Sequence, residues 1–243
     1  MKALNIDHLS VTKDNFALKI KELSLNNGDK LALLGENGAG KSTLFNVIAK
    51  INPHYQGKVR ILGKNLEEYT QLEFARKVAY LPQFFDLIFG FSVFETVLLG
   101  RYPQTQGRYG QRDYQLTAYW LEKLHLLELK QRKFQELSGG EKKRVMLARV
   151  LNQDSSIVFL DEPFAMLDVK FVQMIKKILG QLNKTIICSA HDFNQIKGFC
   201  SRVVFLKQGK IFYQTQTNQI KEEVLKDVFE VDFIKCSGYF VPV

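Results

Sequence analysis

The sequence has few of the features that mark secreted, fibrous or disordered proteins. It contains only three cysteines, Cys188, Cys200 and Cys236, widely spaced and without a CxxC pair. An odd number in that pattern indicates neither a disulfide framework nor a metal site, so we expect three reduced, small apolar residues. With five prolines, 16 glycines and 46% hydrophobic residues among 243, the composition excludes collagen and disorder.

Long apolar runs are missing as well. The longest, Leu87 to Phe94, is interrupted by Gly90 and Ser92 and is far shorter than a transmembrane helix, which needs roughly 20 residues. At the N-terminus, charged residues from Asp7 onward prevent the apolar stretch of about seven residues that a secretory signal requires. We therefore expect a chain that spans no bilayer and resides in the cytoplasm.

Acidic residues are in the minority. Lys and Arg total 34 against 25 Asp and Glu, a formal net charge of +9. That excess favours anionic partners, which are nucleotides, nucleic acid or the anionic face of a membrane, and charge alone does not choose among them. The length suits one large α/β domain, or one such domain with a smaller appendage.

Strand and helix patterns alternate along the chain. Short apolar runs at 31–34, 157–160 and 186–188 are typical of strands covered on both faces, and apolar residues at helical spacing follow the first two. This alternation predicts an α/β fold with a mainly parallel sheet. The pattern of residues 4–25 predicts further strands near a sheet edge, and 203–206 with 211–213 predict a hairpin before a short tail helix.

Residues 84–137 have a different character, because aromatic residues are dense there. This segment is a candidate helical subdomain. Asp113 is predicted to be the N-cap of a helix within it. The residues predicted to face inward from that helix are Tyr114, Ala118, Leu121, Leu124 and Leu127.

A glycine-rich loop follows the first buried strand. Residues 35–42 read GENGAGKS and match GxxxxGK[ST] between a predicted strand and a predicted helix, the context that indicates a phosphate-binding loop. Backbone N–H groups and the helix N-terminus would hold phosphates, Lys41 would reach the β and γ phosphates, and Ser42 would offer an oxygen to Mg²⁺. The alternative, a Gly-rich turn with a solvated lysine, is disfavoured by that context. The predicted nucleotide-binding residues are Gly35, Glu36, Asn37, Gly38, Ala39, Gly40, Lys41, Ser42 and Thr43.

Two acids end the second buried strand. Asp161 and Glu162 follow residues 157–160, and the carboxyl ends of parallel strands meet at one edge of a sheet, which would place the acids beside the phosphate loop. We expect Asp161 to hold Mg²⁺ through water and Glu162 to polarise the attacking water as a general base. Standing alone, the same pair would simply cap the next loop.

Residues 137–141 read LSGGE, and here the chain resembles the nucleotide-binding subunit of ABC ATPases, whose signature is LSGGQ. A serine hydroxyl and two glycine amides at a helix start can form a second anion site, although such a turn can also merely introduce a helix. In the family, the site at Ser138, Gly139 and Gly140 closes on ATP held by a partner subunit. The resemblance therefore implies ATP and Mg²⁺ as cofactors and a homodimer of ATPase subunits.

The resemblance covers nearly the whole chain. It implies a single ABC ATPase domain over residues 1–243, with a P-loop NTPase core, a mainly parallel sheet, an antiparallel β subdomain and a helical subdomain at about 84–137. It assigns Gln83 to the loop that senses Mg²⁺ and water, Asp168 to the loop that communicates between subunits, and His191 to the switch that contacts the γ-phosphate. A lone histidine at a strand end is otherwise more often structural.

Adenine recognition departs from the family pattern. An aromatic residue normally stacks on the base, but Lys13 occupies that position, which leaves Phe16 as the nearby substitute. Phe16 would equally fit simple core packing. Weak stacking would leave the site dependent on phosphate contacts, so discrimination between ATP and GTP would be loose.

Further motifs narrow the resemblance. Gly100 to Pro103 (GRYP) and His191 to Asn194 (HDFN) look like the ATPases of importers for iron-siderophore complexes, haem or cobalamin. Zinc and manganese importer ATPases share part of the pattern and stay open as an alternative. The implied partners are transmembrane permease subunits and, indirectly, an extracytoplasmic solute-binding protein, with the ATPase peripheral at the cytoplasmic face of the inner membrane. Aromatic residues expected at the permease groove are Phe84, Phe85, Phe89, Phe91, Phe94 and Tyr102. The alternative, a place in the core of the helical subdomain, would account for about half of them.

A second class of function, an ABC-type ATPase acting on DNA or ribosomes, would also explain the positive charge. DNA-repair members carry a long coiled coil between the phosphate loop and the signature, whereas Ser42 and Ser138 are only 96 residues apart here, without sustained heptads. Translation-associated members carry two cassettes in one chain, and this chain has one. We therefore expect no nucleic-acid partner.

Overall fold

A computed structural model gives the structure of residues 1–13, 15–85, 90–236 and 239–243. These residues form two compact units, which we call unit 1 (residues 1–68 and 176–243) and unit 2 (residues 69–175). Helix α7 (Val169–Gln181) contains the boundary between them in sequence. Phe89 and the start of the apolar run at Leu87 lie outside the described residues.

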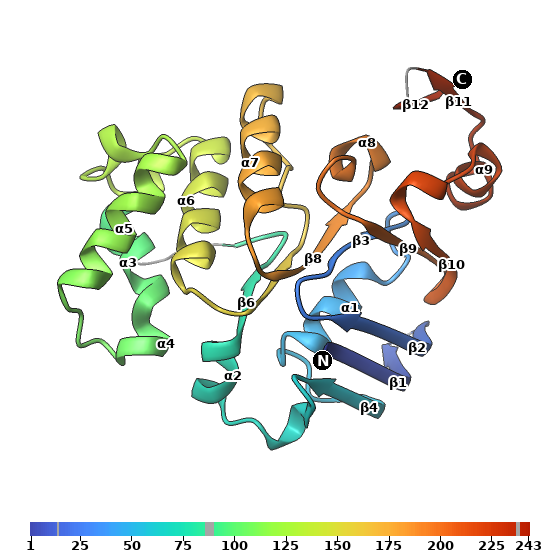
Figure 1. The fold of residues 1–243 in the computed structure, drawn as a ribbon, viewed down its shortest axis with the longest axis horizontal. Helices are drawn as coiled ribbons and strands as arrows, with labels where there is room; N and C mark the ends of the chain where they lie inside the picture. Colours follow the sequence, from blue (N-terminus) through green and yellow to red (C-terminus); the bar gives the residue numbers. More distant parts are fainter. Residues whose placement is uncertain (14, 86–89, 237–238) are drawn as a thin grey trace. The chain divides into compact units, whose positions relative to one another are not determined.

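Unit 1 contains eight neighbouring strands in the order β5-β4-β1-β2-β10-β9-β3-β8, with α1 and α8 among its helices (Figure 1). A separate pair, β11 with β12, lies near the C-terminus. The elements are β1 (Lys2–Lys13), β2 (Phe16–Asn26), β3 (Lys30–Leu34), α1 (Lys41–Ile48), β4 (Gln56–Ile61), β5 (Lys64–Asn65), the 3-10 turn Leu66–Glu68, β8 (Thr185–Ala190), α8 (Phe193–Ile196), β9 (Arg202–Lys207), β10 (Lys210–Gln216), the 3-10 turn Thr217–Gln219, α9 (Glu222–Phe229), β11 (Phe233–Cys236) and β12 (Tyr239–Pro242).

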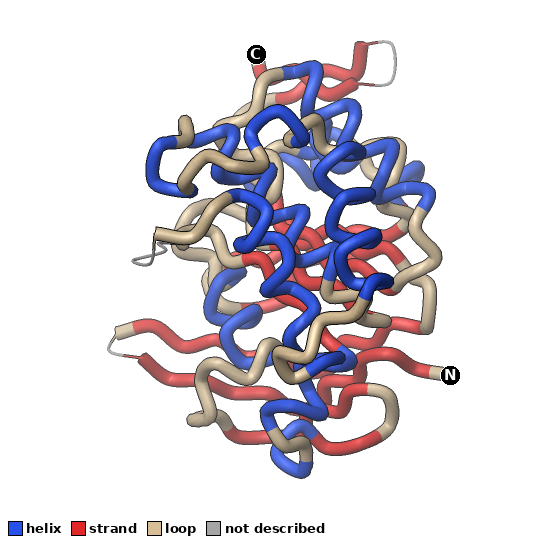
Figure 2. Tube along the Cα trace, turned by 90° about the vertical axis from the view of Figure 1, so that its left-hand side faces the viewer, coloured by secondary structure: helices blue, strands red, loops and turns tan. Residues whose placement is uncertain are grey.

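The strands of unit 1 run antiparallel in one part and parallel in another. β1 and β2 form a long antiparallel hairpin, the first strand of which starts beside the N label in Figure 2. β4 and β5 extend it in the same antiparallel manner. β3 instead pairs parallel with both β8 and β9, and Leu31 to Leu34 are 0% exposed because neighbours cover the strand on every side. The predicted α/β class, with a parallel core and an antiparallel β subdomain, is confirmed.

Unit 2 consists mainly of helices, with the parallel strand pair β6 and β7. Thr70, Ser92 and Ser138 begin three of the helices, and each shares a capping box with the glutamate three residues later. The elements are α2 (Gln71–Lys77), β6 (Val78–Leu81), α3 (Val93–Leu98), the 3-10 turn Leu99–Arg101, α4 (Tyr102–Thr105), α5 (Gln111–Lys123), the 3-10 turns Leu127–Leu129 and Phe134–Glu136, α6 (Gly139–Asn152) and β7 (Ile157–Leu160).

The start of α5 corrects a prediction. Gly110, and not Asp113, is the N-cap; Asp113 lies at the third helical position and accepts a hydrogen bond from Gly110 N at 2.9 Å. The buried face of α5 also differs from the predicted one, because it includes the polar residues Asp113 and Thr117 beside Trp120. The periodicity of apolar residues does not reveal a buried face that contains polar side chains whose hydrogen bonds are made within the protein. Leu121 and Leu124 are buried as predicted, whereas Tyr114, Ala118 and Leu127 are exposed.

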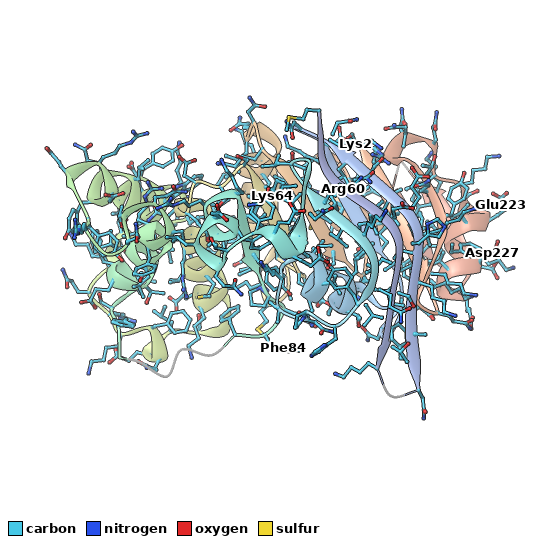
Figure 3. The ribbon with its side chains drawn as sticks, turned by 90° about the horizontal axis from the view of Figure 1, so that it is seen from below. Lys2, Arg60, Lys64, Phe84, Glu223 and Asp227 are labelled. Carbon is cyan, nitrogen blue, oxygen red and sulfur yellow. The ribbon has the colours of Figure 1, made fainter. Side chains whose placement is uncertain are left out.

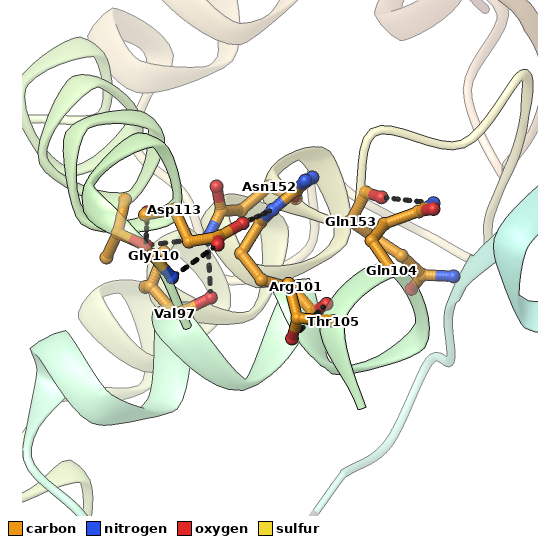
Figure 4. A network of polar contacts seen from close by, with 9 residues as sticks. Val97, Arg101, Gln104, Thr105, Gly110, Asp113, Asn152 and Gln153 are labelled. Carbon is orange, nitrogen blue, oxygen red and sulfur yellow. Dashed lines mark hydrogen bonds and ion pairs between the residues drawn. The ribbon is translucent and has the colours of Figure 1, made fainter. Parts of the chain in front are cut away.

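A buried polar network explains that face of α5 (Figure 4). Arg101 Nε donates to Asp113 Oδ1 at 2.8 Å, and Arg101 Nη1 donates to the backbone oxygen of Asn152 at 2.8 Å. Asn152 Nδ2 donates to Val97 O and to Thr117 Oγ1, both at 2.9 Å. Burial raises the pKa of Asp113, but the hydrogen bonds and charge of Arg101, with the Gly110 N–H, outweigh it and hold the pKa below its usual value.

The C-terminal part of unit 1 contains one more hairpin than predicted. β9, β10 and α9 confirm the predicted hairpin and tail helix, and Glu223 and Asp227 point outward from α9 (Figure 3). β11 and β12 then pair antiparallel. The alternation of apolar and polar residues that marks a strand is missing here. Ile234 and Val241 are exposed and paired with each other, yet they are as apolar as the buried Phe240.

All three cysteines are free thiols, as expected, although Cys236 is exposed whereas Cys188 and Cys200 are buried. Within the part of the chain that the structure describes, no helix has the length and apolar character needed to cross a membrane.

Replacing Asp113 by Ala should lower the free energy of unfolding by about 3–5 kcal/mol, because the Arg101 charge would stay buried without its partner. The double change Arg101→Met with Asp113→Leu should restore most of that loss. Urea unfolding measures both, with the exposed Glu122→Ala on the same helix as control. An Asp113→Ala effect no larger than the control's would contradict the buried pair.

The same pair makes stability depend on pH. Because the folded-state pKa of Asp113 is depressed, its contribution is complete above the ordinary value of 3.8 and disappears as the pH falls through the lower folded-state pKa. The difference in unfolding free energy between wild type and Asp113→Ala should therefore shrink in acid and stay constant near neutral pH.

Candidate functional site

The glycine-rich loop lies in unit 1 between β3 and α1, as predicted. Lys41 is only 5% exposed, and its Nζ donates to the backbone oxygens of Gly35 at 2.6 Å and Glu36 at 2.9 Å. The ammonium is thus held inside the loop by carbonyl groups, at the N-terminal end of a helix whose free N–H groups attract anions. The loop has the charge and geometry of a phosphate site.

Two glycines in the loop are required by close packing. A Cβ on Gly35 would lie 2.3 Å from the backbone oxygen of Leu206, and Gly35 has a φ of 150°. Gly40 has a φ of 104°, and a Cβ there would lie 2.9 Å from the ring of Phe16 and 3.0 Å from Leu18. The loop can therefore lie this close to β2 and β9 only without side chains at these positions.

Phe16 lies against the phosphate loop. Its half-buried ring contacts the Gly40 position and, with Gly38 and Lys210, lines a pocket of about 410 Å³. Lys13 is the direct cross-strand partner of Phe16 in the β1–β2 hairpin. The aromatic ring predicted near the adenine therefore lies on β2, opposite Lys13 on β1 and against the loop.

His191 leaves the sheet at the same edge as the loop. The parallel register of β3 with β8 pairs Leu34 with Ala190, so Gly35 and His191 each follow the last paired residue of their strand. His191 is exposed, and Asp192 caps α8 by accepting from Asn194 N at 2.8 Å. Unit 1 therefore presents the predicted loop, the predicted aromatic and the predicted switch histidine together.

The remaining predicted residues lie in unit 2. The register of β6 with β7 pairs Leu81 with Leu160, and the Asp161 N–H donates to Leu81 O at 2.8 Å. Gln83 and Asp161 therefore emerge at one edge of this pair. Asp161 is 1% exposed. The pKa of Tyr80 is raised, mainly because the side chain is buried and also because the negative charge of Asp161 disfavours ionisation of its hydroxyl.

Glu162 has an unusual backbone. Its φ is 49°, in the left-handed region, and Met166 four residues later has a φ of 66°. Such a conformation costs a residue with a side chain about 1–3 kcal/mol and is concentrated at functional sites. The two adjacent acids also differ in burial, since Asp161 is buried and Glu162 is half-buried.

The LSGGE turn begins α6 in unit 2. Ser138 is the N-cap: its Oγ accepts from Glu141 N at 3.4 Å and donates to Glu141 Oε2 at 2.7 Å, while Ser138 N donates to the same oxygen at 2.8 Å. These hydrogen bonds from Ser138 lower the pKa of Glu141. A Cβ on Gly140 would lie 2.9 Å from the Met166 backbone oxygen, so the turn packs against the loop that follows Glu162.

Lys143 lies beside the predicted residue Asp161, and the sequence reasoning did not single it out. It is 3% exposed, its Nζ lies 3.5 Å from the backbone oxygen of Asp161, and it lies 5.5 Å from the ring centroid of Phe85. With Gln83 and Gly139 it lines a hollow of about 150 Å³. Its helical spacing to the buried Met146 and Leu147 could have revealed that it faces inward.

The parallel strands, the loop between β3 and α1, and the lysine held inside that loop define a P-loop ATPase. Residues 18–165 match the family model described as ABC transporter, and the chain belongs to that family. It is an ATP-binding and ATP-hydrolysing protein of this family.

The chain is similar to known ABC transporter proteins. The ABC transporter ATP-binding protein MJ0089 of Methanocaldococcus jannaschii is 36% identical over 235 residues, which are 92% of each protein. YvrA of Bacillus subtilis is 34% identical over 86% of this chain, which spans about half (49%) of that relative's length. A metal-chelate type ABC transporter solved in an inward-facing conformation matches with a TM-score of 0.82 and 28% identity, over 100% of this chain and 98% of that one.

Gly40→Ala should lower ATP affinity by more than about tenfold, because the new methyl group meets Phe16 and the backbone keeps an unfavourable positive φ. Gly28→Ala is the matched control: its φ of 85° is similarly positive, but no atom lies within 4 Å of the added Cβ. Fluorescent-nucleotide titration compares the two. Equal affinities would show that the close packing of the loop is unimportant.

Proposed function

We propose that this chain is the ATPase subunit of an ABC importer, in which two copies bind ATP, close, act on a membrane permease, hydrolyse ATP and reopen. The observation that carries the proposal is the presence, in one chain, of a phosphate loop with a buried Lys41 and a separate Ser138–Gly140 turn at the start of another helix. One nucleotide has a single γ-phosphate to hold, so the second anion site is explained by the ATP of a partner subunit.

Each predicted residue then has a defined task. Lys41 and the N–H groups of residues 36–43 bind the phosphates, and Phe16 flanks the adenine. Glu162 orients and deprotonates the attacking water, and His191 contacts the γ-phosphate from the edge that it shares with the loop. These roles rest on the family pattern and on the placement of each side chain within its own unit.

Mg²⁺ suits the donors that the chain offers. The Ser42 hydroxyl, the Gln83 amide oxygen and the Asp161 carboxylate are hard oxygen ligands, and Mg²⁺ usually takes only one or two protein ligands plus waters and phosphate oxygens. Bound Mg²⁺ would neutralise the phosphate charge, while Asp161 holds its hydration shell.

Exposed aromatic side chains support a permease partner. Phe84, directly after Gln83, is 77% exposed and projects from the ribbon, and Tyr102 is 52% exposed (Figure 3). We propose that these two side chains contribute to the groove that receives a coupling helix of transmembrane permease subunits. With a permease as partner, we propose a location at the cytoplasmic face of the membrane, a solute-binding protein as an indirect partner, and no nucleic-acid partner.

The transported substrate is proposed from relatives. The hemin import protein HmuV of Thermobifida fusca is 35% identical, and the iron(3+)-hydroxamate import protein FhuC of Bacillus subtilis is 30% identical. These support iron-siderophore complexes or haem, with cobalamin in the same group. The manganese transport protein MntB of Listeria innocua, at 33%, and the molybdate import protein MolC of Haemophilus influenzae, at 29%, keep metal-ion and oxyanion import open.

Glu162→Gln should keep ATP binding but slow hydrolysis by about 100-fold or more, because the amide cannot accept the proton of the attacking water. With turnover blocked, ATP should produce a dimer on a sizing column. Glu128→Gln, an exposed acid of unit 2, is the charge-matched control and should hydrolyse ATP normally. Normal turnover by Glu162→Gln would refute its assignment as the base.

Ser138→Arg, introduced together with Glu162→Gln, should leave ATP binding to the monomer intact and abolish the ATP-dependent dimer, because its bulk would occupy the partner's phosphate position. Ser138→Ala controls for the lost helix cap, which costs about 1 kcal/mol without adding bulk. Sizing chromatography with light scattering reads the outcome. A dimer that survives the arginine would break the two-subunit site.

A further inference from the structure

His191 lies at the start of a short excursion from the sheet of unit 1. Residues 191–201 connect β8 to β9, and α8 within them is a helix of only four residues. A helix this short has little stability of its own, because few backbone hydrogen bonds offset the entropy lost on ordering it. The position of the segment that begins at His191 therefore depends on contacts made with the rest of the protein.

The C-terminal hairpin of β11 and β12 holds this segment through one side chain. Asn194 Nδ2 donates to Phe240 O at 2.8 Å, and Asn194 Oδ1 accepts from Phe240 N at 3.2 Å. A side-chain amide carries a donor and an acceptor side by side, so it can pair with both backbone groups of a single residue. Asn194 thus attaches the segment after His191 to β12.

Aromatic contacts adjoin these two hydrogen bonds. Phe193 is 5% exposed and Phe240 is 3% exposed, and their rings meet edge to face with centroids 5.1 Å apart. The Lys197 ammonium lies 3.9 Å from the Tyr239 ring centroid, which is a cation–π contact with the same hairpin. The two hydrogen bonds of Asn194 are partly buried beside these rings, where a hydrogen bond is stronger than in water.

The hairpin is itself attached to the sheet that carries the phosphate loop. Lys235 N donates to Glu222 Oε1 at 2.8 Å, which joins β11 to α9. Lys207 Nζ donates to the backbone oxygen of Asp227 at 2.6 Å, which joins α9 to β9. β9 and β8 both pair with β3, the strand that precedes the phosphate loop. The contacts therefore run from β3 through β9, α9 and the hairpin to α8, and through β8 back to β3.

We propose that Asn194 is a positioning residue for ATP hydrolysis: by binding β12 it fixes the segment that begins at His191, and so fixes the imidazole at the edge shared with the phosphate loop. The inference rests on the role of His191 in the proposed function. The oxygen and the nitrogen of the Asn194 side chain both engage Phe240, so its effect on the reaction passes through His191. Misplacing a reacting group by about 1 Å can lower a rate about 100-fold, so a contact remote from the nucleotide can control turnover.

Steady-state ATP hydrolysis by Asn194→Ala tests the proposal. The kcat should fall by about fivefold to tenfold while KM and nucleotide affinity change less than about twofold, because the Lys41 loop still binds the phosphates. Asn27→Ala is the matched control, since Asn27 is exposed in the turn between β2 and β3, and it should hydrolyse ATP like the wild type. Asn194→Asp has nearly the same size but lacks the donor to Phe240 O, so it should lower kcat without creating a cavity.

Asn194→Ala in a His191→Ala background separates positioning from a general loss of structure. With the imidazole removed, Asn194→Ala should change the residual single-turnover rate less than about twofold, because the group that it positions is gone. Hydrogen exchange provides a second readout. In Asn194→Ala the backbone amides of residues 193–197 should exchange faster than in the wild type, and those of β3 should be unchanged.

The proposal is overturned by a wild-type kcat in both Asn194 variants, by equal losses of rate from Asn194→Ala with and without His191, or by unchanged exchange at residues 193–197. A wild-type kcat in His191→Ala alone would refute the role of that histidine in the proposed function together with this inference. A loss of kcat in His191→Ala with none in Asn194→Ala would refute this inference alone.

Discussion

The hydrogen-bond register of parallel strands decides where the chemistry of this protein lies. In unit 1 the pairing of Leu34 with Ala190 makes the phosphate loop and His191 leave adjacent strands at one edge. In unit 2 the pairing of Leu81 with Leu160 does the same for Gln83 and Asp161. Parallel strands point the same way, so the segments that follow them emerge together although the paired residues are far apart in the sequence. A slip by one residue would turn every side chain to the opposite face.

Each half of the site is held by local interactions that also constrain its chemistry. Lys41 is kept inside the loop by two carbonyl oxygens, and Ser138 is engaged with Glu141 in a capping box. The loop's own carbonyl groups therefore fix the position of the lysine ammonium. Ser138 would serve two purposes in the proposed function, because the hydroxyl that caps α6 would also contact the nucleotide of a partner subunit. Left-handed backbone at Glu162 adds strain at the residue assigned to the water.

Features encoded by neighbouring residues were predicted correctly, and features that depend on residues far apart in the sequence were not. The phosphate loop at 35–42, the acids at 161–162 and the turn at 137–141 are contiguous motifs, and the structure has each of them next to the predicted type of element. The buried face of α5 was predicted wrongly because Asp113 and Thr117 are buried through partners on other helices, Arg101 and Asn152. The hairpin of β11 and β12 was missed because both of its faces carry apolar residues, which removes the period of two.

The sequence alone determined the class of fold, the phosphate loop and the ATPase family, because these depend on short-range spacing between glycines, lysine, acids and apolar runs. Only the tertiary structure decided which side of α5 is buried, that Lys143 approaches Asp161, that Phe16 rests on Gly40, and that Asn194 pairs with the backbone of β12. Those facts join residues distant in the chain, and burial and hydrogen bonding between such residues exist only once packing has brought them together.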